Sequence, residues 1–124
     1  MGKISRIWLA MGLTVMLTFM AARVSALDDA EMAKIEALLT AVGQKTDIQF
    51  IRNKKAFSAR EAEKHLRRKL ATVRNKLTSV DEFIDKVASV SSMSGEDYLV
   101  KLPDGRIIPA RSYFRDLLAS ISSS

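Results

Sequence analysis

The sequence predicts an α+β fold: a small single domain of about four helices with one or two short antiparallel β-hairpins, after an N-terminal signal peptide. Three observations support this prediction. Apolar residues recur every three or four positions in four segments, as they do in helices that bury one face. Short β-branched runs lie beside turn-forming residues, which is typical of hairpins. The chain also opens with a basic start and an apolar run, the pattern of an export signal.

The export signal is predicted from three consecutive features. Lys3 and Arg6 form a basic start, and residues 7–22 are a weakly polar to apolar run. Residues 24–26 are small or β-branched and match the site that a signal peptidase reads. The apolar run is shorter than the roughly 20 residues that a membrane-spanning helix needs.

We therefore expect residues 1–26 to be a signal peptide that is cleaved near Ala26-Leu27. Residues 27–124 would then be a single small domain in the periplasm or outside the cell, with no spanning helix. Arg23 lies just after the apolar run, which is unusual for a cleaved signal. An uncleaved N-terminal anchor is the alternative interpretation.

Composition limits the kinds of site that the domain can hold. The 124 residues include no cysteine and one histidine. Disulfides, a lipoprotein anchor and cysteine-based zinc sites are therefore excluded, and so is a histidine-rich metal site. We expect neither a metal nor a cofactor. The three basic residues of the signal leave without an acidic one, so the formal net charge falls from +6 to +3 (6 − 3).

The first helix is predicted to begin after Asp28, an N-cap residue followed by Glu31. Gly43 is placed to stop this helix as a C-terminal glycine. The predicted buried stripe consists of Met32, Ile35, Leu38, Leu39 and Val42.

A short strand is predicted at residues 48–51, where apolar and polar residues alternate weakly. Residues 52–55 would turn the chain, either as a looser loop or as a tight hairpin that returns through Ala56 and Phe57.

The second helix has the clearest sequence signals. Ser58 and Glu61 form an S-x-x-E capping box, and the helix is expected to end near Lys76. Its predicted buried stripe is Ala59, Ala62, Leu66, Leu70, Val73 and Leu77. Its opposite face carries Arg60, Lys64, Arg67, Arg68, Arg74 and Lys76, with His65 at the border.

A third helix is predicted over residues 79–88, with Ser79 and Glu82 as a second capping box. Thr78 with Asp81 is the competing register. A polar, serine-rich loop follows at residues 89–97.

The C-terminal part is predicted to form a hairpin and a last helix. Residues 98–102 and 106–108 would pair around a type I turn followed by a bulge. Pro109 is expected to end the ladder because it has no N–H. The helix over residues 110–120 would bury Tyr113 or Phe114, together with Leu117, Leu118 and Ile121.

Residues spread over most of the predicted domain carry a resemblance to a known family. They are residues 50–53, Ser58, Ala62, His65, Leu66, residues 82–84, Ala88, Ser89, residues 91–95, Tyr98, Asp104, Gly105 and Pro109. Through them the chain, from about residue 32 to 118, resembles an uncharacterised family of small exported bacterial proteins, a domain of unknown function. The resemblance implies a periplasmic location and a small single domain, and it implies no activity. The chain departs from the family pattern at Asn53-Lys54, where the family tends to have Asn-Gly.

Residues 52–76 are strongly basic. This segment contains ten basic residues and two acidic ones, Glu61 and Glu63, which gives a local charge of +8 (10 − 2). This asymmetry predicts a non-enzymatic binding protein whose partner is an acidic protein surface or an anionic envelope component. Export and the lack of interleaved aromatic residues make nucleic acid an unlikely partner. The residues expected to bind are Arg60, Lys64, Arg67 and Arg68.

Two other hypotheses stay open at this stage. A solvated helix face, in a structural envelope protein with no ligand pocket, would show the same charges. A serine hydrolase would use His65 as its base, oriented by Glu61, and a serine of the loop, although no G-x-S-x-G motif is present. In the conservative alternative, His65 hydrogen-bonds the loop and fixes it to the helix. The residues of this second, polar pocket are Arg52, Asn53, His65, Ser91, Ser92 and Ser94.

Overall fold

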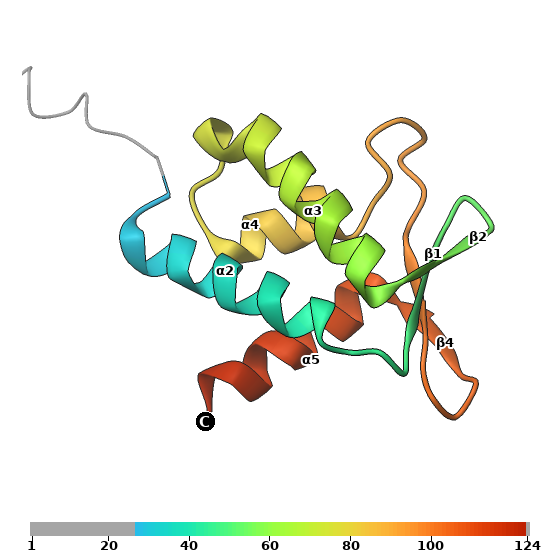
Figure 1. Cartoon of the computed structure of the whole chain (residues 1–124). Helices are drawn as coiled ribbons and strands as arrows, with labels where there is room; N and C mark the ends of the chain where they lie inside the picture. Colours follow the sequence, from blue (N-terminus) through green and yellow to red (C-terminus); the bar gives the residue numbers. More distant parts are fainter. Residues whose placement is uncertain (1–26, 124) are drawn as a thin grey trace, which may run out of the picture.

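The computed structural model describes residues 27–123. The predicted signal peptide, residues 1–26, and Ser124 lie outside the described residues. The described part of the chain forms a helical body with a small antiparallel sheet at one end (Figure 1). The predicted α+β class is confirmed.

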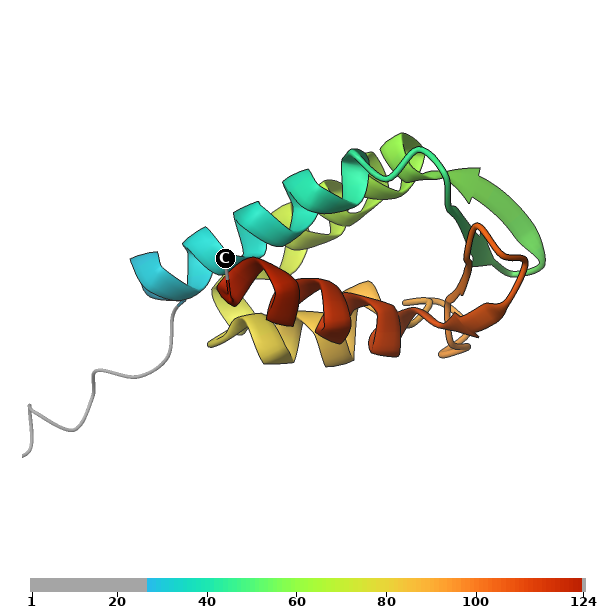
Figure 2. The ribbon, with the colours of Figure 1, turned by 90° about the horizontal axis from the view of Figure 1, so that it is seen from below.

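Four α-helices build the body in the described part of the chain: α2 (Asp29–Gly43), α3 (Ala59–Val73), α4 (Val80–Phe83) and α5 (Ala110–Ser122). A 3-10 turn, η2 (Arg74–Lys76), follows α3, and a π-helical turn, η3 (Ile84–Ala88), follows α4. Figure 2 shows two layers, with α2 beside α3 in one and α5 beside α4 in the other.

Four strands form one sheet: β1 (Gln49–Arg52), β2 (Lys55–Ser58), β3 (Leu99–Lys101) and β4 (Ile107–Pro109). Their order is β2-β1-β3-β4, and every neighbouring pair is antiparallel. The two predicted hairpins therefore join through β1 and β3, with Phe50 opposite both Phe57 and Val100.

The core lies between the helical layers and extends to the sheet. Phe50 of β1 stacks on Phe114 of α5 with ring centroids 5.9 Å apart, which ties the sheet to the body. Phe114 is almost fully buried, whereas the neighbouring Tyr113 is half-buried. The largest fully buried side chains are Phe83, Phe114, Ile35, Leu38, Leu39, Ile84, Val42 and Val100.

The three predicted N-caps are confirmed. The side chains of Asp28 and Ser58 accept hydrogen bonds from the backbone N–H groups of Glu31 (2.8 Å) and Glu61 (3.2 Å). The Glu61 carboxylate in turn accepts from the Ser58 N–H at 3.1 Å, so the capping box of α3 is complete. Ser79, and not Thr78, caps α4 by accepting from the Glu82 N–H at 3.1 Å.

Gly43 has a different role from the one predicted. It is the last residue of α2 rather than a stop beyond it, and Gln44 is the C-cap. A Cβ at Gly43 would collide with the side chain of Glu63 on α3. The glycine therefore leaves room for the Glu63 carboxylate beside the end of α2.

The ladder ends at Pro109, as predicted, but Pro109 is its last paired residue and not the residue beyond it. Pro109 is the last residue of β4 and pairs with Leu99. The Ala110 N–H donates to the Tyr98 carbonyl at 2.8 Å, across this pair, which makes Leu99–Pro109 a pair of the non-hydrogen-bonded type. The Pro109 nitrogen therefore faces the outer edge, where a missing N–H breaks no ladder bond.

The tight form of the first hairpin is present. Asn53 and Lys54 have positive φ angles of 50° and 69°, as a two-residue type I′ turn requires. Asparagine tolerates this conformation well, whereas lysine adopts it at a steric cost. The pairing of β1 with β2 holds Lys54 there.

The third predicted helix is not regular, because residues 84–88 form the π-helical turn η3. Such turns are rare and occur mostly as single-turn bulges. The Asp85 carbonyl in this turn accepts a hydrogen bond from Arg111 at 3.1 Å. At the C-terminus, α5 continues to Ser122, beyond the expected end at residue 120. None of the helices in residues 27–123 combines the length and apolarity needed to cross a lipid bilayer.

Candidate functional site

A half-open pocket of about 280 Å³ lies where β1 and β2 meet α3. Most of its wall is apolar, and four aromatic side chains contribute to it. The lining residues are Phe50, Ile51, Arg52, Phe57, Glu61, Ala62, Lys64, His65, Leu66, Arg68, Ala88, Tyr98 and Phe114. Apolar pockets with a few polar groups at one side are the usual form of small-ligand sites.

Arg52 and His65 contact each other at this pocket. The Arg52 Nη1 atom lies 2.9 Å from Nε2 and 3.2 Å from Nδ1 of His65. Arginine carries only donors, so the imidazole must accept, which requires its neutral form. Partial burial lowers the pKa of His65 to about 4, and the positive charges of Arg52, Lys69 and Arg68 act in the same direction. The ring is therefore neutral at pH 7.

The Arg52 side chain also packs on an aromatic ring. Its guanidinium carbon lies 4.8 Å from the centroid of the Phe57 ring, within the range of a cation–π contact. Phe57 follows Arg52 across the first hairpin. Strand pairing thus places the guanidinium between a ring on β2 and the imidazole on α3.

Lys69, one turn after His65 on α3, is directed into the protein instead of the solvent. Its Nζ atom donates to the carbonyl oxygens of Val87 (2.6 Å) and Val90 (2.8 Å). It also lies 3.3 Å from the Tyr98 hydroxyl and 5.0 Å from the centre of that ring. Burial, aided by the charge of Arg52, lowers the pKa of Lys69 to about 8, so the amine is still mainly protonated at pH 7.

The conservative interpretation of His65 is thereby corrected. His65 contacts Arg52 and, at 3.4 Å, the Tyr98 hydroxyl. The serine-rich loop is tied to α3 by Lys69, which reaches the backbone at both ends of the segment from Val87 to Val90. A short, neutral imidazole cannot replace an extended ammonium group that satisfies two carbonyl oxygens.

The predicted polar pocket is divided by the structure. Arg52 and His65 line the apolar pocket, whereas the three loop serines and Asn53 lie outside its lining. Ser91 is buried and accepts from the Ser94 N–H at 3.4 Å, and the Ser94 hydroxyl donates to Asn53 Oδ1 at 3.5 Å. Ser92 is exposed.

The hydrolase hypothesis needs a serine that is hydrogen-bonded to His65, and the structure shows no such bond among the described residues. Among the hydrogen bonds of residues 27–123, none joins His65 to Ser91, Ser92 or Ser94. The carboxylate of Glu61, the expected orienting group, is bonded to the Ser58 N–H in the capping box. A serine–histidine pair of the kind that nucleophilic catalysis uses is therefore not assembled.

Three of the four residues predicted to bind an anion form one stripe on α3. Arg60, Lys64 and Arg68 are spaced four apart and exposed, and we call them the basic stripe. Within the described part of the chain, no ion pair involves any of the three. Lys64 and Arg68 also line the apolar pocket.

Arg67 differs from the stripe. Its Nη1 lies 2.7 Å from Glu36 of α2 and its Nε lies 2.9 Å from Glu63, and a third donor reaches the Thr40 hydroxyl at 3.3 Å. These contacts raise the pKa of Arg67 and link α3 to α2. Arg67 is therefore a structural cation.

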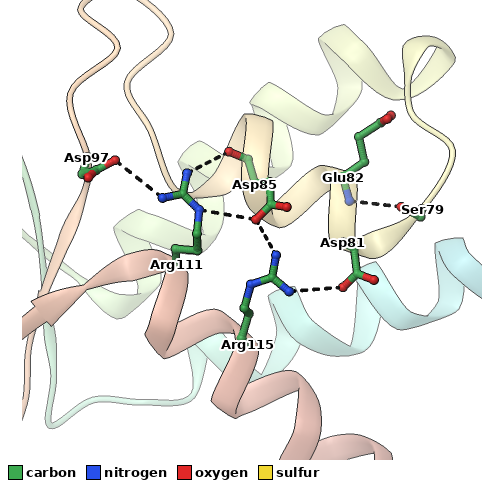
Figure 3. A network of polar contacts seen from close by, with 7 residues as sticks. All are labelled: Ser79, Asp81, Glu82, Asp85, Asp97, Arg111 and Arg115. Atoms are coloured by element: carbon green, nitrogen blue, oxygen red, sulfur yellow. Dashed lines mark hydrogen bonds and ion pairs between the residues drawn. The ribbon is translucent and has the colours of Figure 1, made fainter.

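A second group of arginines lies on α5 and faces the aspartates of α4 and η3 (Figure 3). Arg115 of α5 lies 2.6 Å from Asp85 and 3.7 Å from Asp81, and Arg111 lies 3.3 Å from Asp85 and 3.8 Å from Asp97. We call these five residues the paired network.

Lys69 and the hydroxyl of Tyr98 are not among the site residues predicted from the sequence. A signal for Lys69 was present, because position 69 lies beside Leu66 and Leu70 at the edge of the buried stripe. A lysine so close to an apolar face is expected to reach an acceptor within the protein. Nothing in the local sequence indicates that the acceptors belong to residues 87 and 90. No group of three acidic or histidine side chains in residues 27–123 is placed to hold a metal ion.

Comparison with known proteins agrees with the resemblance seen in the sequence. The chain is 48% identical over 68 residues to the uncharacterized protein YfeK of Salmonella typhimurium (strain LT2). This match covers 55% of the chain and 57% of the length of that protein, so it spans little more than half of the curated relative. No solved structure matches the chain significantly. A family model described as a family of unknown function, DUF5329, matches residues 29–122, which is nearly the whole described domain. The chain belongs to this family.

Proposed function

We propose that the domain is a periplasmic, non-enzymatic protein that binds an anionic surface of the bacterial envelope through the basic stripe of α3. The observation that carries this proposal is that the cations of the stripe are exposed and not paired with carboxylates in the described part of the chain. Arg60, Lys64 and Arg68 are exposed, lie on one side of one helix and have no carboxylate partner among residues 27–123. Each such side chain near an anionic membrane surface contributes about 1 kcal/mol of attraction.

Of the four residues predicted from the sequence to bind an anion, the proposal keeps Arg60, Lys64 and Arg68 and leaves out Arg67. Arg67 already contacts two carboxylates, so a partner would have to compete with Glu36 and Glu63 for it. Glu61 adds a negative charge beside the stripe, but its carboxylate is bonded within the capping box. The stripe is therefore the region of α3 that can meet an anion without first breaking an ion pair.

Binding to vesicles tests the proposal. The protein, purified after expression of the full chain in a bacterium, would be sedimented with vesicles of phosphatidylglycerol or of phosphatidylcholine at low and high salt. We expect binding to phosphatidylglycerol alone, with loss at high salt. A variant with Arg60→Gln, Lys64→Gln and Arg68→Gln removes about 3 kcal/mol of attraction, a loss of roughly a hundredfold in affinity.

The matched control removes three other exposed cations, through Arg74→Gln, Lys76→Gln and Lys101→Gln, and keeps the same net charge as the test variant. Equal losses in both variants would show attraction by net charge and contradict a role for the stripe. If neither vesicle binds but the stripe variant loses an acidic protein that the wild-type protein retains from envelope extract, the partner is that protein.

The location is tested separately by the mass of the exported product. Expression of the full chain should give a periplasmic protein whose intact mass corresponds to a first residue Leu27. A membrane-bound protein that retains residues 1–26 would support the uncleaved anchor instead.

A further inference from the structure

Arg52 is a half-buried cation without a carboxylate partner. Among residues 27–123, none of the ion pairs includes it, and its contacts are a neutral imidazole and the face of the Phe57 ring. Burial removes water from a guanidinium, and a neutral acceptor replaces only part of the lost hydration. An anion placed against Arg52 would therefore gain more than it would at a fully exposed arginine.

The cavity next to Arg52 is suited to an apolar group. Phe50, Phe57, Tyr98 and Phe114 contribute rings to its wall, and Ala62 and Leu66 contribute aliphatic surface. Its positively charged lining residues, Arg52, Lys64 and Arg68, are accompanied by a single carboxylate, that of Glu61. Apolar walls and cationic residues together select a molecule with an apolar body and a negative end.

We propose that this pocket binds a small amphiphilic carboxylate, with its apolar body among the aromatic rings and its carboxylate held by Arg52. The planar guanidinium fork matches the two oxygens of a carboxylate. This inference goes beyond the proposed function but shares two cations with it, because Lys64 and Arg68 belong to both the basic stripe and the pocket lining.

The volume of the pocket limits the size of the ligand. A cavity of about 280 Å³ holds roughly nine groups the size of a water molecule, at about 30 Å³ each. An eight-carbon chain or a phenylpropyl group fits, whereas both acyl chains of a phospholipid do not. The expected ligand is a carboxylate whose enclosed apolar body has about this size, either straight-chain or aromatic.

His65 contributes by its neutrality. A carboxylate at position 65 would form an ion pair with Arg52 and occupy the place of the ligand. The imidazole holds the Nη1 atom at 2.9 Å without neutralising the guanidinium. The remaining donors of Arg52 have no hydrogen-bond acceptor among the described residues, so they are available to the ligand.

Calorimetric titration with simple probes tests the inference. The protein from full-chain expression would be titrated with straight-chain carboxylates from butanoate to octanoate, with 3-phenylpropanoate, and with octylammonium. We expect the affinity to rise about fourfold for each added methylene group, and octylammonium not to bind. Comparison of octanoate with 3-phenylpropanoate distinguishes an aliphatic from an aromatic ligand.

Two variants locate the binding site. Arg52→Met should reduce the affinity for octanoate at least tenfold, and Ala62→Leu should reduce it by filling the pocket while adding only apolar volume. Arg74→Met, at an exposed cation of η2, is the matched control and should bind as the wild-type protein does.

Several results would overturn the inference: equal binding of octanoate and octylammonium, an affinity independent of chain length, or full affinity in a folded Arg52→Met protein. If octanoate binding is lost in the variant with Arg60→Gln, Lys64→Gln and Arg68→Gln but kept in Arg52→Met, the carboxylate binds to the stripe and not to Arg52. If vesicles bind through the stripe and octanoate does not bind at all, the inference fails and the proposed function stands. If octanoate binds through Arg52 while neither vesicles nor an acidic envelope protein bind through the stripe, the proposed function fails and the inference stands.

Discussion

The paired network and the two inward-facing cations Arg52 of β1 and Lys69 of α3 use similar residues in opposite ways. Arg111 and Arg115 together meet three aspartates, so their charges are balanced within the protein. Arg52 and Lys69 meet an imidazole, carbonyl oxygens and aromatic rings, and no carboxylate. The two regions lie in one small domain.

This difference shows that the number of basic residues does not identify a binding surface. Whether each cation is paired with a carboxylate does identify it. A paired arginine has used its donors, whereas an unpaired one near an apolar cavity retains both charge and donors for a ligand. The comparison can be tested by removing single members of each region.

The largest effect is expected at Lys69, where the cation has no substitute. Lys69→Met keeps the aliphatic chain and removes the charged donor from the Val87 and Val90 carbonyls. We expect the free energy of unfolding to fall by about 2–3 kcal/mol, because hydrogen bonds to charged groups contribute this much. Urea unfolding measures it. Lys64→Met, on the exposed side of the same helix, should change it by less than about 0.5 kcal/mol, and equal losses would contradict the distinction.

Arg67 and Arg68 are neighbours that should behave in opposite ways. Arg67→Gln loses contacts with Glu36, Glu63 and Thr40 and should lower stability by about 1 kcal/mol, with little effect on vesicle binding. Arg68→Gln should leave stability unchanged and weaken binding. Thermal unfolding and vesicle sedimentation of both proteins check this pair, and a binding loss confined to Arg67→Gln would reverse the assignment.

The paired network should depend on salt. Asp85→Asn keeps the side-chain shape but removes the charge that Arg111 and Arg115 share. We expect a loss of about 0.5–1 kcal/mol at low salt that shrinks at high salt, because partly exposed ion pairs are screened. Urea unfolding at two salt concentrations measures the change. A loss that does not depend on salt would mean that the network acts through packing.

The smallest expected effect is the pH dependence caused by His65. Its pKa of about 4 in the folded protein lies below the ordinary value of 6.5, so between these values the unfolded chain binds more protons. Stability should therefore decrease as pH falls from 6.5 towards 4. The decrease should be shallower in His65→Gln, which has no imidazole to protonate. The difference between the two proteins should be small, because the ring is only partly buried. Identical profiles of the two proteins in thermal unfolding would contradict this role.

The elements fixed by neighbouring residues could be predicted from the sequence. Ser58 and Glu61 lie three positions apart and close a capping box by local geometry alone. The buried stripe of α3 follows in the same way from helical periodicity, and Ala59, Ala62, Leu66 and Leu70 are all buried. Such features need no knowledge of the rest of the chain.

The features that were missed depend on partners far away in the sequence. Gly43 was predicted as a helix stop, and its own segment gives no sign that the Glu63 side chain of another helix lies against it. Arg67 looked like part of a basic face because only one of its two carboxylates, Glu63, is on its own helix. The pocket itself combines β1, β2, α3 and α5, so periodicity within one segment cannot indicate it.

The outer edges of the sheet have a consequence for the behaviour of the protein at high concentration. An open strand edge offers free N–H and C=O groups to a second molecule and is a common start of aggregation. At β4, Pro109 presents no N–H to the outer side, and the chain turns directly into α5. At β2, the exposed Lys55 follows the Asn53-Lys54 turn, so two molecules that approached edge to edge would bring like charges together. Both edges therefore resist the addition of a further strand, which allows the domain to remain dispersed without a partner covering its sheet.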